Sequence, residues 1–271
     1  MGAFFAVSVM PIFLPRWAGT QRTPQHDARL GLNLAFMAGA INAGGFMAIG
    51  YYTSHMTGVI SAVADDLILG QLALVSAGLM MVVAFLLGAM CTAILVNMGR
   101  RQRLHGRYSI PLLLEASLLA LFGLIGHKWA FDTPMAVPMT ALLLSFMMGL
   151  QNALITKISN SVIRTTHVTG LVTDMGIELG KLIYINTATH PRAKRVRANR
   201  GRLKLHASLL AAFLGGGILG AWGFQRFGFL TALPLALWLL LLALRPLFFD
   251  FRVRRNLRRW QRRRSQIRLR P

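Results

Sequence analysis

Acidic residues and cysteine are both scarce in this chain. Its 271 residues include 8 Asp and Glu against 30 Lys and Arg, and only one cysteine. That single thiol, Cys91, excludes an internal disulfide and a multi-cysteine metal site. Charged residues make up 14% of the chain, whereas soluble domains carry about 25%. These shortages, together with 55% hydrophobic content and a positive mean hydropathy, indicate a membrane protein.

Signature motifs of common enzymes are also missing. The chain contains no Ser-x-x-Lys, no His-Glu-x-x-His and no nucleotide-binding loop. Its seven histidines show no His-x3-His or Cys/His spacing that would support a metal site. We therefore expect no enzymatic activity, no cofactor and no metal.

The excess of basic residues gives a formal net charge of +22, which could suggest nucleic acid. The basic residues, however, lie between and after apolar stretches, so anionic lipids are the expected partner. In the tail at 250–271, Val253, Leu257, Trp260 and Ile267 fall on one helical side with Arg elsewhere. That pattern is typical of a helix lying on an anionic membrane surface, and RNA binding is the weaker alternative.

Six apolar stretches follow one another along the chain, each near the roughly 20 residues that a helix needs to cross a bilayer core. They are Leu30–Gly50, Gln71–Met98, Ile110–Gly126, Pro134–Ile155, Leu205–Phe224 and Phe229–Phe249. No polar break is long enough to separate two folded domains. We expect one all-α membrane domain over 30–249, preceded by a segment at 1–29 that is cytoplasmic and interfacial or, alternatively, signal-like.

The distribution of Lys and Arg among the connecting segments predicts the orientation of these spans. Starting from the N-terminus, the segments carry three, none, four, one, ten, one and eleven basic residues. High and low counts alternate without exception. Both termini are therefore predicted to be cytoplasmic, in a multi-pass membrane protein.

One motif occurs twice, as YYTSHMTGVISAVADDLILG from Tyr51 and as IRTTHVTGLVTDMGIELGK from Ile163. At an offset of 112 residues His55 aligns with His167, and an acidic residue follows each histidine by 11 positions. The other aligned positions include Thr53 with Thr165, Thr57 with Thr169, Gly58 with Gly170 and Asp66 with Glu178. We interpret the two copies as an internal duplication.

The duplication divides the membrane domain into a first repeat at 30–126 and a second at 134–249. Each repeat holds three spans, an odd number, so the two must lie in opposite orientations. Inverted repeats are common in secondary transporters, whose substrate sites lie at the repeat interface beside interrupted helices. We expect such interrupted or re-entrant helices at the two motifs.

The polar residues of the motifs predict the chemistry of this site. On a helix, His167, Asp174 and Glu178 share one face. Two carboxylates four residues apart can approach and raise each other's proton affinity, which favours proton or cation handling. Asn42 and Asn152 occupy similar places in the two repeats and are expected to form hydrogen bonds between helices.

Two functional interpretations remain open. In the first, the protein is a small-solute permease, with proton coupling as one option, and its polar path is lined by the residues of both motifs. That path comprises His55, Thr57, Gly58, Asp66, His167, Thr169, Gly170, Asp174, Glu178, Asn42 and Asn152. In the second, Ser/Thr-His-x-Thr-Gly only caps and breaks helices, and the protein is a non-transporting scaffold or stress-related membrane protein. The solute is unknown and a homo-oligomer stays open.

A polar residue outside the motifs is Glu115, which is expected to extend from the third span toward Arg107 in the adjacent basic loop.

With these motifs in view, the chain resembles the YoaK-type family, bacterial inner-membrane proteins that are grouped as a domain of unknown function. The resemblance runs from about Leu30 to Phe249. It is carried by NAGGFMAIGYYTSHMTGVISAVADDL and GLQNALITKISNSVIRTTHVTGLVTDMGIELGKL. It implies a multi-span membrane protein and supplies no substrate, because the family has no established activity to carry over.

Overall fold

Helices make up all the regular structure that is described. The computed structural model describes residues 23–128, 136–186, 195–244, 246–248 and 251. Its elements are α1 (Pro24–Ile49), α2 (Met56–Ile68), α3 (Leu72–Arg101), α4 (Ser109–Lys128), α5 (Ala136–Ile158), α6 (Val168–Ile183), α7 (Arg200–Phe227) and the 3₁₀ turn η2 (Gly228–Thr231). A further helix covers 232–244. The predicted all-α class is thus confirmed for this part of the chain.

Five of these stretches are long and apolar enough to cross a membrane. Four of them correspond to α1, α3, α4 and α5, and the fifth runs over Arg200–Phe248. This last stretch contains α7, the turn η2 and the helix at 232–244. By length and composition these helices make the chain a multi-pass membrane protein.

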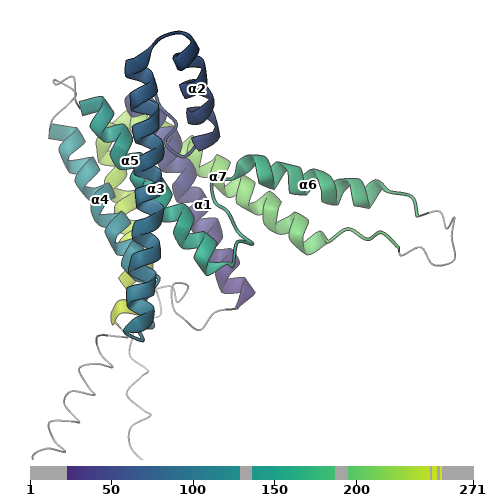
Figure 1. Ribbon diagram of the computed structural model, residues 1–271. Helices are drawn as coiled ribbons and strands as arrows, with labels where there is room; N and C mark the ends of the chain where they lie inside the picture. The colour runs from purple at the N-terminus through teal and green to yellow at the C-terminus, as the bar shows by residue number, and fades with distance from the viewer. Residues whose placement is uncertain (1–22, 129–135, 187–194, 245, 249–250, 252–271) are drawn as a thin grey trace, which may run out of the picture.

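The bundle is built on two pairs of parallel helices, α1 with α7 and α3 with α5. Along the first pair, Gly31 lies near Leu209, and further on Gly44 lies near Phe224. The residue numbers at the contacts therefore increase together along the two helices, which run parallel. Figure 1 shows α3 lying along α5, with α4 beside them, while α1 and α7 cross behind.

A Phe-x-x-Gly sequence recurs at the centre of all four paired helices. In each pair, the glycine of one helix packs against the backbone carbonyl of the phenylalanine on the other. The contacts are Gly39 with Phe213, Gly216 with Phe36, Gly88 with Phe146, and Gly149 with Phe85. A Cβ at any of these glycines would overlap the facing carbonyl oxygen. Small residues at such crossings let the helix backbones approach closely inside a membrane.

The two short helices lie outside the paired core. α2 packs on α3, and α6 packs on α7. α6 and the first part of α7 project away from the other helices as a separate arm (Figure 1). Neither short helix is among the candidate spans, because α2 has 13 residues and α6 has 16.

The first helix begins earlier than the sequence predicted. α1 starts at Pro24 rather than Leu30, so residues 24–29 belong to this helix. Thr23 accepts a hydrogen bond from the His26 N–H and Pro24 occupies the first turn, which is a favourable helix start. Residues 1–22, and the basic tail except for Phe251, lie outside the described residues.

Candidate functional site

The first motif is tied back to α1 by one asparagine. Gly50 ends the helix in the left-handed conformation (φ 77°) and the chain turns. Ser54 then donates from both its N–H and its hydroxyl to Asn42 Oδ1, at 3.1 and 2.9 Å. Asn42 therefore holds the motif of its own half, whereas the sequence predicted bonds between spanning helices.

The second motif repeats this arrangement on α5. The Thr166 hydroxyl donates to Asn152 Oδ1 at 2.7 Å, and the Asn152 amide donates to Met148 O. Ser54 and Thr166 are aligned by the offset of 112 residues, so the same contact recurs in each half. Two independent copies of one bond indicate a local structure that the duplication preserved.

A buried threonine precedes each of these residues. Thr53 and Thr165 are fully buried, and within the described chain neither hydroxyl has a hydrogen-bond partner. A buried polar group without a partner is costly, so such groups are uncommon unless water or a ligand satisfies them.

Each motif histidine sits at the start of a short helix. His55 is the cap residue of α2 and His167 that of α6, with similar backbone angles. Each imidazole folds over the glycine three residues later, Gly58 or Gly170, and fills the place where a Cβ would lie. The glycines are therefore needed for packing, while both histidines remain exposed.

The acidic residues of α6 do not form the pair that the sequence predicted. The buried Glu178 carboxylate accepts from Lys181 Nζ at 2.9 Å and from the Asn199 N–H at 2.6 Å. Lys181 first, and then Asn199, hold the pKa of Glu178 below its ordinary value. The expectation of a proton-retaining carboxylate pair is wrong for Glu178, because its negative charge is already balanced.

Asp174 takes a different partner across the helix pair. Its half-exposed carboxylate lies 3.9 Å from Nδ1 of His206, which comes from α7. His206 is only 2% exposed, and its Nδ1 has no hydrogen bond among the described residues. An ionisable ring is thus held between two helices with one nitrogen unused.

A cavity of about 500 Å³ opens at this point, between the start of α6 and α7. Its charged and titratable walls are Arg164, His167, Asp174, Arg202 and His206, and Thr169 and Gly170 also line it. Two arginines face one aspartate, and the first turn of α6 presents its backbone N–H groups at the same end. Such an arrangement favours a small anion.

The first half has no equivalent of this cavity lining. At the offset of 112, Ala62 stands in place of Asp174. The paired Phe-x-x-Gly sequences align α3 with α7 at an offset of 128, which puts Gly78 in place of His206. His55, Thr57, Gly58 and Asp66 belong to the segment of α2, and none of them lines the cavity. The structure therefore gathers four predicted residues at the cavity, namely His167, Thr169, Gly170 and Asp174, whereas Glu178 does not line it.

Sequence reasoning missed Arg202 and His206. Both belong to α7, whose first turns are basic and were counted as part of a loop. The available signal was the histidine itself, which stands at the edge of an apolar stretch where ionisable residues are expensive.

Glu115 is also placed differently from the expectation. It is fully buried, and both carboxylate oxygens lack a hydrogen-bond partner among the described residues. Arg107 donates instead to the Tyr108 hydroxyl, at 3.1 Å. The predicted reach from Glu115 to Arg107 is wrong, because Glu115 lies about 9 Å along α4 from its first residue and faces the bundle.

The sequence matches a known protein family. The family described as "Protein of unknown function (DUF1275)" matches residues 30–245, most of the chain. The chain belongs to this family. The predicted resemblance to a family of unknown function is confirmed at that level, and the match ends close to the expected limits of the membrane domain. No curated protein and no solved structure matches the chain.

Proposed function

We propose that this member of the DUF1275 family is a small-solute permease of the bacterial inner membrane, in which the cavity of the second half binds an anionic or zwitterionic solute. The observation that carries the proposal is the matched helix break. In both halves an asparagine binds the motif, an unpartnered threonine is buried, and a histidine opens a short helix. Interrupted helices of this kind line the substrate sites of secondary transporters.

The packing of α1 and α5 supports two inverted halves. Gln151 donates to Leu34 O, while the Cβ position of Gly45, further along α1, lies 3.1 Å from Leu144. Residues further along α1 contact residues earlier on α5, so these two helices, each the first of its repeat, run antiparallel. With α7 and the helix at 232–244 counted separately, the halves would contribute three spans each.

A buried acid supports coupling to protons. Glu115 lies within a candidate span, and both of its carboxylate oxygens lack a hydrogen-bond partner among the described residues. Acidic groups are expensive at membrane depth and are usually found on ion or proton pathways.

The scaffold interpretation also has an observation in its favour. The imidazoles of His55 and His167 pack on Gly58 and Gly170, so part of each motif serves local packing. The two interpretations differ at Arg202, which lines the cavity and whose side chain forms no hydrogen bond with the described residues.

The deciding experiment measures uptake of labelled small carboxylates and phosphate into proteoliposomes under an imposed pH gradient. Arg202→Gln should lower the rate at least tenfold, because one charge-assisted contact contributes about 1.5–3 kcal/mol. Arg200→Gln is the matched control, since Arg200 is exposed, lies two residues away and does not line the cavity. Uptake by the unchanged protein at the rate of empty liposomes would leave the scaffold as the remaining function.

A further inference from the structure

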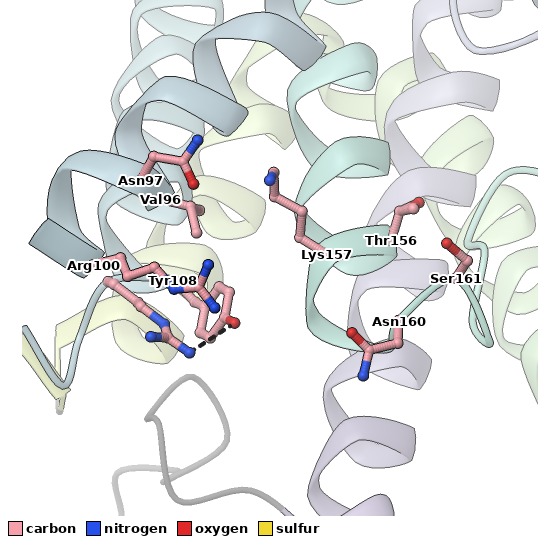
Figure 2. A pocket seen from close by; sticks show the side chains of 9 residues that line it. Val96, Asn97, Arg100, Tyr108, Thr156, Lys157, Asn160 and Ser161 are labelled. Carbon is pink, nitrogen blue, oxygen red and sulfur yellow. Dashed lines mark hydrogen bonds between the residues drawn. The ribbon is translucent and has the colours of Figure 1, made fainter.

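A second cavity, of about 350 Å³, lies where the ends of α3 and α5 meet the connection into α4. Figure 2 shows Asn97, Arg100 and Tyr108 on one wall and Lys157, Thr156 and Asn160 on the other. Arg107 completes the lining, together with Val96 and Ser161. Three of the described side chains that line it are cationic, and none is acidic.

The cations of this pocket have hydrogen-bonding capacity to spare. Within the described residues, neither the Arg100 side chain nor the Lys157 side chain forms a hydrogen bond or an ion pair. The Arg107 guanidinium lies over the Tyr108 ring, 4.8 Å from its centroid, and donates to the Tyr108 hydroxyl. Its Nε is buried without a partner. Three like charges around one hollow repel one another, so an anion between them would be bound favourably.

The backbone conformation of two residues that line the pocket is a second feature consistent with an anion site. Asn160 and Ser161 both adopt positive φ angles, 50° and 66°. Glycine has the lowest strain in that region, and Gly50 ends α1 in this conformation at the position that aligns with Asn160 by an offset of 110. Asparagine tolerates the conformation next best and adds an amide to the pocket.

The equivalent end of the other helix pair shows that packing does not require these polar groups. At the same offset, Phe46 and Met47 of α1 stand in place of Thr156 and Lys157 of α5. The end of α1 therefore has no cation, amide or hydroxyl at these positions, so the part of the lining that comes from α5 has no counterpart on α1.

We infer that this pocket binds a phosphate group, carried either by an anionic phospholipid headgroup or by a soluble phosphate. Arginine guanidinium groups match phosphate oxygens with two parallel N–H donors, and lysine adds a mobile point charge. The volume lies within the range of about 300–1,000 Å³ found for small-molecule sites. The inference does not depend on solute transport, because the charged side chains that line this pocket differ from those that line the cavity at the second motif, although Ser161 lines both.

The test is the thermal unfolding midpoint of the full-length protein, purified in a neutral detergent. Three additions are titrated: inorganic phosphate, dioleoylphosphatidylglycerol and dioleoylphosphatidylcholine. If phosphatidylglycerol alone stabilises the protein, the site binds lipid. If inorganic phosphate alone stabilises it, the site binds a soluble ligand. If both stabilise it, the site recognises the phosphate group that they share. Stabilisation by none, or equally by phosphatidylcholine, overturns the inference.

Single substitutions test whether the stabilisation arises at this pocket. Arg100→Gln and Lys157→Gln should each weaken the apparent affinity at least about tenfold, as loss of a charge-assisted hydrogen bond requires. Arg101→Gln removes the same charge from the neighbouring position outside the pocket and should change the affinity less than threefold. Asn160→Gly keeps the positive φ, removes the amide, and should fold normally with several-fold weaker binding. Equal losses in Arg101→Gln and Arg100→Gln would show diffuse attraction by the basic surface and refute a pocket.

Discussion

Neighbouring glycines on α7 offer the sharpest test of the helix pairing. Gly216 faces the backbone carbonyl of Phe36 on α1, and a Cβ built at this position would overlap that oxygen, well inside the 3.4 Å at which ordinary contacts begin. Gly215, one residue earlier, would meet nothing within 4 Å. The substitution Gly→Ala is chemically identical at both sites, so only the packing differs.

The two variants should change stability in opposite directions. Gly215→Ala should stabilise α7 by about 0.5–1 kcal/mol, because alanine loses less backbone entropy in a helix. Gly216→Ala must push α1 and α7 apart, and overpacking of this kind costs about 1–3 kcal/mol and occasionally more. We expect the two variants to differ by about 1.5–4 kcal/mol in the free energy of unfolding.

The measurement is equilibrium unfolding in mixed micelles, in which the denaturing detergent fraction is raised stepwise and helix content is followed. Gly88→Ala is a second probe, because Gly88 faces Phe146 O in the other helix pair. The Gly88→Ala variant should lose a similar amount of unfolding free energy. Equal stability of Gly215→Ala and Gly216→Ala would show that α1 and α7 do not approach as described, and the account of the core would fail.

Three further predictions concern the motifs and the topology. The pKa of Glu178 is lowered in the folded protein, so its carboxylate stabilises the α6–α7 contact at pH values above the ordinary pKa of 4.5, and this contribution is lost as the pH falls through the lowered pKa. Glu178→Gln should therefore melt at a lower temperature at neutral pH and lose less stability on acidification. A constant difference in melting temperature between the two proteins from about pH 3 to 7 would contradict the pairing. Thr53→Val and Thr165→Val remove hydroxyls that have no partner in the described chain, so both should unfold at the same or a higher temperature; a marked drop would mean that these hydroxyls are satisfied within the fold. Reporter fusions should indicate cytoplasm after Gly99 and periplasm within 127–133, and reversal of either signal would refute the orientation derived from the basic loops.

Hydropathy and residue spacing were sufficient for the class of protein and for most helix positions. The free energy of burying an apolar side chain in lipid depends on that residue and its immediate neighbours, so the stretch Gln71–Met98 alone predicts a span close to α3. The recurrence of the motif was equally visible, because residues such as His55 and His167 can be aligned without a fold.

Contacts between distant segments could not be obtained in this way. The sequence showed Asp174 and Glu178 four residues apart, but the charge state of Glu178 depends on Asn199, which α7 brings to it. Likewise Gly216 is one small residue among several until Phe36 of α1 lies against it. Electrostatic and packing energies depend on distances in space, so tertiary structure alone decided which polar residues are paired, which are left unpaired, and where the cavities form.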